Sequence, residues 1–368
     1  MKRIFTVLTS IALTFALSFS AAFANDDALM KLQNYLKTIT LDSPDAVIAY
    51  EATGMEADYK ADALLNNFKE TDYVTASYGD LAKSIIAISL LGENPKDFNN
   101  TNLVEILENR VQEDGTLTND VNGGCGATIW TLMALETVNS PKVKAVADKL
   151  STMAMDNGAY WYEYQGQNAD LDTTGWAMEA LSVAGRSTYK AAISKAYTFV
   201  QSKLNSTDGY YDNWGGNADT QSCVLEGLSV AGYTLDTNAY NYLLSYQNED
   251  GTFNALNYST GQLEPNAYAS VEGARALGVI NNGSFVLRAR RDYTETTTPV
   301  VTEPETPTTP TKPSTTTPAV KPETTTTEPK KETVKVVNTG DNTNVMAYVV
   351  AAIAAVGVIV LVIKSKKK

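Results

Sequence analysis

Four carboxylates occupy matched places in two closely similar stretches of this sequence. ADLDTTGWAMEALSVAG carries Asp172 and Glu179, and ADTQSCVLEGLSVAG carries Asp219 and Glu226. Glycosidases that invert the anomeric centre use two carboxyl groups about 6.5–9.5 Å apart, one as acid and one as base. A carbohydrate-active enzyme that uses two of these four carboxylates is therefore one hypothesis for this chain.

The same carboxylates also have a structural interpretation. Asp172 and Asp219 are each followed by Thr at the start of an apolar helical run. An acidic side chain at such a place accepts hydrogen bonds from free backbone N–H groups. The sequence therefore predicts that both residues cap their helices. Glu179 and Glu226 follow two turns later on the same stripe. Because neighbouring helices lie about 8–10 Å apart, Glu226 is expected to pair with Arg275 of the next repeat.

Runs similar to the ends of these stretches recur along the chain and mark a repeat. Five of them begin 47, 46, 47 and 49 residues apart, and an earlier copy, AYEATG, stands at 49–54. Each closes an apolar helical stretch, and four end in a glycine where a helix needs a left-handed residue: Gly54, Gly92, Gly185 and Gly232. The five runs are AISLLG (87–92), ALETVN (134–139), ALSVAG (180–185), GLSVAG (227–232) and ALGVIN (276–281).

A more polar helix is expected after each apolar one, so the repeat unit is a pair of helices. These second helices are predicted at 58–69, 99–110, 141–155, 188–204 and 236–246. Turns with Asp-Gly or Asn-Gly, such as QNEDGTF, follow the last four, and they predict a positive φ at the glycine.

Two arrangements of helix pairs fit this period: an open solenoid of the HEAT type and a closed ring. An unpaired amphipathic helix at 26–39 precedes the first pair, and the sixth apolar helix at 266–278 lacks a strong partner after it. Placing these two helices side by side closes a ring of six inner and six outer helices. The sequence therefore favours an all-α fold, an α/α toroid, over residues 25–293.

The helix pairs and their turns resemble the prenyltransferase and squalene-oxidase repeats of the terpenoid-cyclase toroid superfamily. QNEDGTF (247–253) matches the Q-x-x-D-G-x-aromatic turn of that family, and QEDGTL (112–117) is similar to it. The resemblance covers most of residues 45–280 and implies the toroid fold. It does not imply one activity, because enzymes and carriers share this fold.

Several activities of toroid proteins need residues that this chain lacks. Protein prenyltransferases hold zinc with an Asp, a Cys and a His, and the sequence has no histidine. Cyclases resembling squalene–hopene cyclase use D-x-D-D-T-A, whereas DLDTTG has Thr173 in place of the third Asp. Complement-type thioester domains use G-C-G-E-Q, whereas GGCGAT has Thr128 where the glutamine that would react with Cys125 must stand. We therefore expect neither a metal nor a cofactor.

The cobalamin carriers resembling transcobalamin are a further branch of the toroid proteins. Their inner helices begin with runs similar to DTTGWAMEAL. They clamp the corrinoid between the toroid and a second, β-rich domain, whereas this chain passes directly into a Thr/Pro-rich stretch. Corrinoid binding is therefore an alternative that requires another partner.

Three segments that enter inner helices are rich in aromatic residues: 160–170, 210–219 and 253–265. All three join an outer helix to the next inner one, so we expect them on one face of the ring. Tyr and Trp beside Asn, Asp and Gly suit a glycan or another small amphipathic ligand. The predicted ligand-binding residues are Trp161, Tyr164, Asp172, Tyr211, Trp214, Asp219 and Tyr258.

The ends of the chain predict export and a membrane span. Residues 1–24 have the basic start, apolar run and A-x-A site of a secretory signal peptide. The uncharged span 345–363 is long enough to cross a bilayer, and the basic tail 364–368 after it predicts a cytoplasmic C-terminus. Residues 294–344 form a Thr/Pro-rich linker with little to bury.

The end of that linker resembles the cell-wall sorting signal of Gram-positive surface proteins. The motif VVNTGD implies cleavage by sortase between Thr339 and Gly340, although Val336 and Val337 replace the usual Leu-Pro. A plain membrane anchor is the alternative.

Charge and composition exclude some classes of partner. The net charge is −13 and basic clusters are scarce, which argues against nucleic acid. Only two cysteines occur, Cys125 and Cys223, and the sequence leaves open whether they form a disulfide. The favoured function is non-catalytic binding or adhesion on the extracellular face of a Gram-positive-type cell, with a glycosidase and a corrinoid-binding protein as alternatives.

Overall fold

The computed structural model describes residues 27–56, 62–120, 124–163, 166–211 and 216–293. They all belong to the first of two compact units, Met1–Val300. The predicted signal peptide, linker, sorting motif and apolar span lie outside the described residues, as do Tyr164 and Trp214. Among the residues described, no helix has the length and apolar character needed to cross a bilayer.

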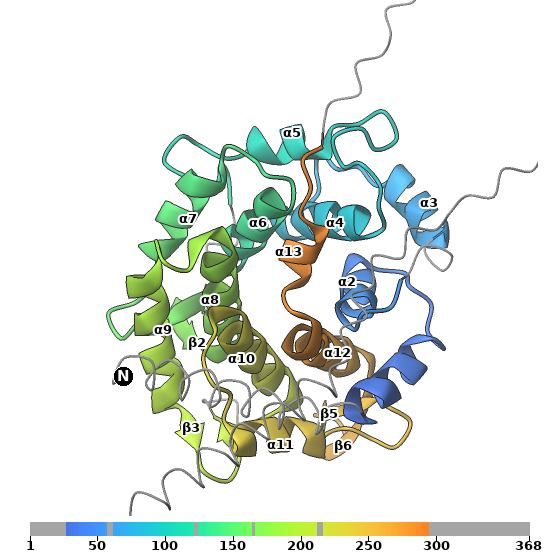
Figure 1. Cartoon of the computed structure of the whole chain (residues 1–368), viewed down its shortest axis with the longest axis vertical. Coiled ribbons are helices and arrows are strands. Elements are labelled where there is room, and N and C mark those ends of the chain that lie inside the picture. Colours follow the sequence, from blue (N-terminus) through green and yellow to red (C-terminus); the bar gives the residue numbers. More distant parts are fainter. Residues whose placement is uncertain (1–26, 57–61, 121–123, 164–165, 212–215, 294–368) are drawn as a thin grey trace, which may run out of the picture. The chain divides into compact units, whose positions relative to one another are not determined.

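The helices of this unit form two concentric rings (Figure 1). The inner ring consists of α2 (Pro44–Ala52), α4 (Tyr78–Leu90), α6 (Cys125–Thr137), α8 (Leu171–Gly185), α10 (Ala218–Ala231) and α12 (Ala267–Asn282). The outer ring consists of the helix at 27–36, α3 (Asp62–Glu70), α5 (Leu103–Glu108), α7 (Val143–Ser151), α9 (Lys190–Ser202) and α11 (Thr237–Ser245). Each inner helix packs against the inner helices on both sides of it, and α12 packs against α2. The described residues thus confirm an α/α toroid.

The two kinds of helix differ because they are buried differently. An inner helix is covered by other helices on several sides, so in α2 all residues from Ala46 to Tyr50 are buried. An outer helix rests on the inner ring along one stripe only. In α9 the buried residues are Ile193, Ala196, Phe199 and Val200, which share one helical face. The apolar and amphipathic patterns of the sequence follow from these two positions.

The helix at 27–36 closes the ring, as the sequence predicts. Gln247 Nε2, after α11, donates to Ala28 O at 2.9 Å. Gln33 Nε2 donates to Thr53 O, at the end of α2, at the same distance. The first described helix therefore bridges the last repeat and the first.

Asp-Gly turns show that this helix takes the place of a regular outer helix. At Gly115, φ is +82°, and a Cβ would lie 2.1 Å from Ala145 O on the next outer helix. At Gly251, φ is +89°, and a Cβ would lie 2.2 Å from Lys31 O. Both glycines are required by their backbone conformation and by the close approach of the neighbouring helix. The predicted positive φ in these turns is confirmed.

The prediction of a purely helical fold was wrong where outer helices lead back to the inner ring, because three antiparallel β-hairpins form there. Two of them lie in the aromatic segments 160–170 and 253–265, and the third, at 204–210, ends where the remaining aromatic segment begins. Their strands are β1 (Tyr160–Glu163) with β2 (Gln167–Asp170), β3 (Leu204–Asn205) with β4 (Gly209–Tyr210), and β5 (Phe253–Asn257) with β6 (Gln262–Asn266). In each hairpin a fully buried aromatic residue donates its backbone N–H to a side chain in the second turn of the next inner helix. The pairs are Tyr160 with Thr174 Oγ1 at 2.9 Å, Tyr210 with Gln221 Oε1 at 2.8 Å and Phe253 with Ser270 Oγ at 2.8 Å.

A short helix that the sequence did not predict, α13 (Phe285–Ala289), follows α12 and packs on α2, α4 and α6. We call residues 284–293 the strap. Phe285 and Val286 of the strap are fully buried. Arg291 donates its Nη1 to Ser89 O, at the end of α4, at 2.7 Å. The strap therefore covers the end of the ring at which the inner helices finish.

The two cysteines lie on different inner helices, α6 and α10. Cys125 and Cys223 are both buried free thiols. No disulfide joins them, so the stability of the ring rests on packing and hydrogen bonds.

Candidate functional site

Asp172 and Asp219 lie in the first turns of α8 and α10, but they do not cap these helices. The cap of α8 is Asp170, whose carboxylate accepts from Thr173 N at 2.7 Å. The cap of α10 is Asn217, whose side chain accepts from Thr220 N. The capping prediction was wrong by two residues, because the last extended residue before each helix is the cap. Neither Asp172 nor Asp219 is therefore the N-cap of its helix.

The repeat places three layers of residues along the inner helices. Counted back from the first residue of each repeated run, the mouth layer stands eight residues earlier, the middle layer four and the deep layer one. The mouth layer is Leu41, Gly79, Gly126, Asp172, Asp219 and Tyr268. The middle layer is Asp45, Lys83, Trp130, Trp176, Cys223 and Glu272. The deep layer is Ile48, Ile86, Met133, Glu179, Glu226 and Arg275. Steps of four and three residues keep each set on one stripe of its helix.

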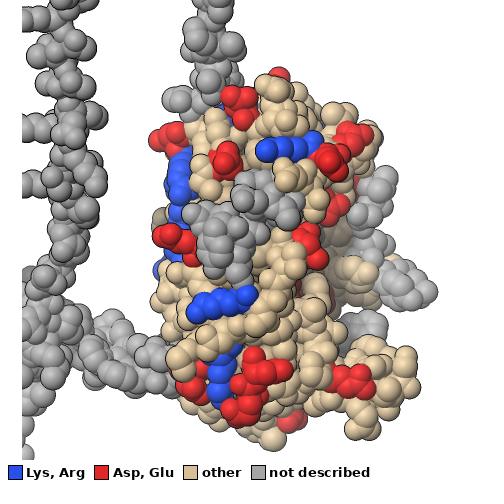
Figure 2. Space-filling view, turned by 90° about the vertical axis from the view of Figure 1, so that its right-hand side faces the viewer, with Lys and Arg blue, Asp and Glu red and all other residues tan. Residues whose placement is uncertain are grey.

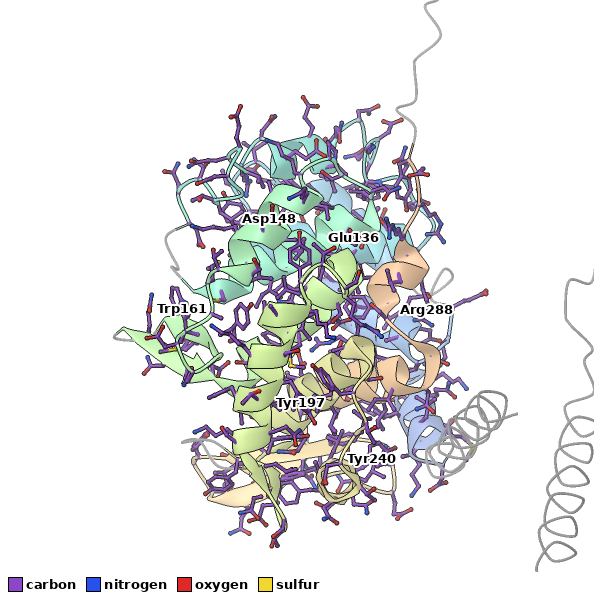
Figure 3. The ribbon with its side chains drawn as sticks, turned by 60° about the vertical axis from the view of Figure 1, so that its left-hand side comes forward. Glu136, Asp148, Trp161, Tyr197, Tyr240 and Arg288 are labelled. Carbon is purple, nitrogen blue, oxygen red and sulfur yellow. The ribbon has the colours of Figure 1, made fainter. Side chains whose placement is uncertain are left out.

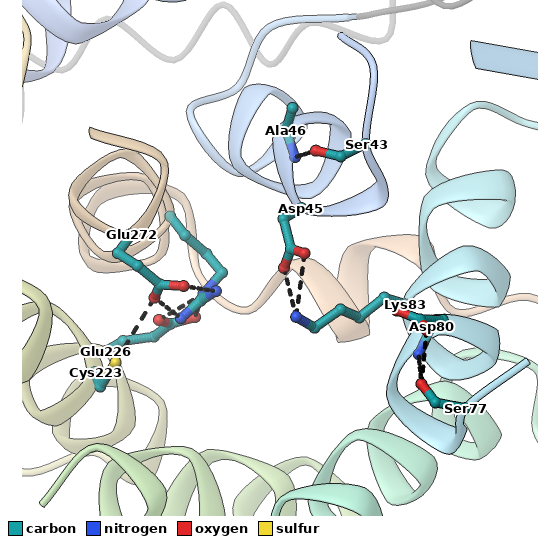
Figure 4. Close-up of polar contacts among 10 residues, drawn as sticks. Ser43, Asp45, Ala46, Ser77, Asp80, Lys83, Cys223, Glu226 and Glu272 are labelled. Carbon is teal, nitrogen blue, oxygen red and sulfur yellow. Dashed lines mark hydrogen bonds and ion pairs between the residues drawn. The ribbon is translucent and has the colours of Figure 1, made fainter. Parts of the chain in front are cut away.

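The predicted pair of Glu226 with Arg275 is confirmed in the deep layer. Arg275 Nε lies 2.8 Å from Glu226 Oε2, and both side chains are fully buried. The same guanidinium also binds Glu272 (Figure 4). Its central carbon lies 5.6 Å from the rings of Trp130, on α6, and Trp176, on α8. Arg275 therefore reaches from α12 toward the tryptophans of two other inner helices.

Glu179 is also fully buried in the deep layer. Ser284 Oγ of the strap donates to Glu179 Oε1 at 3.1 Å. Burial, and then the charge of Glu226, raise the pKa of Glu179 well above its usual value. Burial therefore favours the protonated form of Glu179. Enclosed in this way, Glu179 and Glu226 serve the core of the ring and are out of reach of a glycan.

The middle layer joins neighbouring helices by polar and aromatic contacts. Lys83 Nζ lies 2.8 Å from Asp45 Oδ1, and both side chains point into the ring (Figure 4). The ammonium also lies 4.7 Å from the Trp130 ring, which meets the Trp176 ring edge to face at 5.8 Å. Trp176 Nε1 is buried and has no hydrogen-bond partner among the described residues.

The sequence held a signal for this aromatic pair. Trp130 and Trp176 stand 46 residues apart, at equivalent places of successive repeats.

Asp219 is a carboxylate of the mouth with a raised pKa. Its Oδ1 is buried and finds no donor in the part of the chain that the structure describes. Burial, and then the charge of Glu272, raise the pKa of Asp219 to about 6. The charge of Glu272 also raises the pKa of Tyr268, whose side chain is 55% exposed. Both residues therefore lie close enough to Glu272 for its charge to raise their pKa values.

A cavity of about 750 Å³ opens at the mouth beside α4 and α6. In the mouth layer these helices carry glycines, and a Cβ built on Gly126 would meet no atom within 4 Å. On Gly79 it would meet only Ser77 Oγ, at 3.9 Å. The room in the cavity thus comes from two missing side chains. Its lining includes Ser77, Tyr78, Asn109, Arg110, Thr118, Asn119, Asp120 and Tyr162.

The predicted aromatic residues do not share one role. Trp161 is half-buried, packs on the core and donates its Nε1 to Met153 O at 3.1 Å, so it holds the first hairpin to the ring. Tyr211 and Tyr258 are 49% and 85% exposed. Tyr162, which was not predicted, is 56% exposed and lines the cavity. Strand residues alternate between two faces, so Tyr162 faces solvent because its neighbour Trp161 faces the core.

The two faces of the domain separate clearly in the side view. Trp161, on the first hairpin, and Arg288, in the strap, lie at opposite sides of the domain (Figure 3). On the side shown in Figure 2, acidic and basic side chains are interspersed over the described surface. In the described ranges no group of three or more Cys, Asp or Glu side chains has the arrangement of a metal site.

Comparisons with known proteins give only distant likenesses. No protein-family model matches the sequence, and no curated protein matches it significantly. Among solved structures, a protein from Actinoplanes is 13% identical with a TM-score of 0.45, over 72% of this chain and 90% of that one. An unsaturated glucuronyl hydrolase from Bacillus sp. GL1, responsible for degradation of glycosaminoglycan, has the same identity and TM-score over 70% and 96% of the two chains. These values are too low to transfer an activity.

Proposed function

We propose that this domain binds a carbohydrate at the mouth of the ring without turning it over. The observation that carries the proposal is the cavity of about 750 Å³ beside Gly79 and Gly126. Arg275, Trp130 and Trp176 lie close together further in, whereas the cavity opens at the mouth. Pockets that take small ligands have volumes of about 300–1,000 Å³.

The lining of the cavity suits the chemistry of a neutral sugar. Tyr162 offers an exposed aromatic ring, and Asn109 and Asn119 offer amide groups. The cationic side chain in the lining, Arg110, donates to the carbonyls of Ala76, Tyr73 and Val74 at 2.7–2.8 Å. Its role is therefore to hold the loop before α4, which leaves amides, hydroxyls, the Tyr162 ring and the carboxylate of Asp120 in the lining.

The hairpins extend this surface beyond the cavity. Tyr211 and Tyr258 belong to the second and third aromatic segments, and both are exposed. Since all three hairpins precede inner helices, they rise on the face where the cavity opens. An extended glycan fits this arrangement better than a compact ligand does.

A variant of one glycine tests the proposal. Gly126→Trp should fill the cavity and abolish binding in a glycan screen of the full-length protein, with little change in its thermal unfolding. Gly126→Ala adds one methyl group and serves as the matched control, which should still bind. If Gly126→Trp binds every glycan that the unchanged protein binds, the cavity is not the site.

Hydrolysis of a glycan is the second candidate function, and Asp219 favours it. A carboxyl group whose pKa is raised to about 6 is suited to act as a general acid near neutral pH. Incubation of the protein with the glycans that it binds, followed by analysis of the reducing ends, decides between the two functions. Turnover that disappears in Asp219→Asn while binding remains would establish the enzyme and reject the non-catalytic proposal. The same screen should include a corrinoid, which the resemblance to transcobalamin suggests.

The ends of the sequence support display on a cell surface. We propose that sortase cleaves between Thr339 and Gly340 and links the protein to the wall of a Gram-positive-type cell. Wall-degrading enzymes should then release the protein, and detergent alone should not. Replacing both residues should move it to the membrane fraction or the medium; an unchanged, detergent-soluble location would instead support a plain membrane anchor through 345–363.

A further inference from the structure

We infer that the strap is a pH-dependent cover, which detaches from the ring when Glu179 becomes ionised. The strap lies where the inner helices finish, so this property is separate from the proposed carbohydrate binding at the other face. Gly283 joins the strap to α12, with a φ of +79° and no atom within 4 Å of the position of a Cβ. The chain can therefore turn at this glycine while α12 stays in the ring.

The strap is bound to repeats distant from its own. It follows α12 in the chain, but α13 packs on α2, α4 and α6. At its far end Arg290 Nη1 lies 2.7 Å from Glu136 Oε1, and Arg291 N donates to Thr137 O at 3.1 Å, both on α6. At its near end Ser284 Oγ donates to Glu179 Oε1 of α8. Glu179 is thus the carboxyl group that the near end of the strap contacts.

Ionised Glu179 is poorly compensated at this place. Arg275 is the guanidinium of the deep layer, and it already binds two buried carboxylates, Glu226 and Glu272. Glu179 Oε2 is buried and receives no hydrogen bond from the described residues. A third buried negative charge would therefore have one hydroxyl group, that of Ser284, in place of water. Detachment of the strap would give this charge the solvation that it lacks.

The other elements that pack against α8 bring few charges to Glu179. β1 contacts the first turns of the helix, through Tyr160 and Thr174. On α6 the deep-layer residue is Met133, which is uncharged, and α10 adds the buried thiol of Cys223 beside Glu226. The exposed cations of the outer helices α7 and α9 are Lys144, Lys190 and Lys195. Arg275 is thus the cation whose charge acts on Glu179.

Protonation of Glu179 and docking of the strap are therefore linked. Burial raises the pKa of Glu179 well above 4.5, Glu226 raises it further, and Arg275 and Ser284 have smaller, lowering effects. When the strap detaches, water reaches the carboxyl group and its pKa falls back. The favourable contribution of Glu179 to docking is complete below about pH 4.5 and is lost as the pH rises through the raised pKa. Because one proton is released, the equilibrium constant for detachment can increase by up to about tenfold per pH unit.

Detachment would change how the domain is held. It would add residues 284–293, about 30 Å of extended chain, to the predicted linker that follows them. It would also uncover the apolar surface that Phe285 and Val286 now bury. A domain displayed on a cell surface would gain reach at higher pH.

Hydrogen exchange of the full-length protein at several pH values between 5 and 8 tests the linkage. The protection factor of the strap amides, which corrects for the effect of pH on intrinsic exchange, should fall about tenfold or more over this range. In Glu179→Gln, which keeps an acceptor for Ser284 but cannot ionise, it should no longer fall. Glu113→Gln, on an exposed outer turn, makes the same change in net charge and should retain the fall.

The amides of α10 report on the ring in the same experiment and should keep their protection. Joint loss of protection in the strap and α10 would show that the whole ring opens, and would reject a separate cover. Constant protection of the strap in the unchanged protein, or an equal fall in Glu179→Gln, would overturn the role of Glu179. Ser284→Ala keeps the titrating group, so it should lower protection at each pH and retain the fall; a constant value would also overturn that role. Glycan binding does not enter this measurement, so its failure would leave the proposed function standing.

Discussion

The two faces of the ring differ in how they are covered. Where the inner helices end, the strap fills the opening with Phe285 and Val286, and Arg291 donates to the carbonyl that ends α4. Where they begin, Gly79 and Gly126 remove side chains, and hairpin tyrosines stand in solvent. One face is closed by burial and hydrogen bonds, whereas the other keeps a cavity and unsatisfied polar atoms.

This difference shows which parts of the fold serve stability and which are available for binding. Exposed aromatic residues and unpaired buried polar atoms are both unfavourable in a free protein. Exposed tyrosines and the unsatisfied Asp219 Oδ1 occur together at the mouth. The contrast predicts that changes on the closed face will lower stability and changes on the open face will lower binding.

The largest expected effect compares one aromatic residue from each face. Phe285→Ala should lower the free energy of unfolding by about 3–5 kcal/mol, because the side chain is fully buried. Tyr258→Ala should change it by less than about 0.5 kcal/mol, because that side chain is 85% exposed. Denaturant unfolding measures both. Similar losses in the two variants would break the distinction between the faces.

A second prediction concerns the point where the faces meet, at Arg275. Arg275→Met should lower the free energy of unfolding by about 3–5 kcal/mol, because it leaves Glu226 and Glu272 buried without their cation. Adding Glu226→Gln and Glu272→Gln to that variant should restore much of the loss. A triple variant less stable than Arg275→Met would show that the charges are not the cause.

A third prediction separates capping from the open mouth. Asp170→Ala should cost about 1 kcal/mol of stability, because the side chain accepts from Thr173 N. Asp170→Asn, which keeps the acceptor, is the control and should cost much less. The thermal unfolding of the variants checks this. A loss of stability in Asp172→Ala but not in Asp170→Ala would show that Asp172 is the cap, as the sequence predicts.

The smallest expected effect is a pH dependence from Asp219. Its pKa of about 6 lies above the value near 3.9 of an unfolded aspartate, so the folded state binds more protons between these values. Its favourable contribution is complete below about pH 4 and is lost as the pH rises through 6. The melting temperature of Asp219→Asn should therefore rise relative to that of the unchanged protein between pH 4 and 7. A constant difference would contradict the raised pKa.

The helical repeat was predictable from sequence because it is encoded in spacing. Glycines after the inner helices, such as Gly232 with φ of +76°, and the Asp-Gly turns mark the boundaries of elements locally. Ring closure was also predictable, since an unpaired helix at one end matched a missing one at the other. The pairing of Glu226 with Arg275 followed from the same register.

Other features depended on interactions that a repeat does not reveal. The hairpins form because a side chain of the next helix, such as Gln221, receives the buried strand's N–H, and this partner lies on a separate element. The strap has no counterpart in the other repeats. The cavity was not predictable because it arises from glycines, which have no side chain to mark a site. The exposure of Tyr162 follows from the pairing of β1 with β2, which the repeat pattern does not reveal.

The closing helix at 27–36 also determines the order in which the molecule can be completed. Gln247 contacts Ala28 across a sequence separation of 219 residues, so the first helix has its final partner only after nearly the whole domain has been made. Such distant contacts slow folding, and they leave apolar surface exposed in the growing chain. Leu32 and Leu36 are fully buried in the folded domain, but they stay exposed to solvent until the last repeat has been synthesised. A chain that emerges from its N-terminus first therefore cannot finish its first repeat until its last one is synthesised.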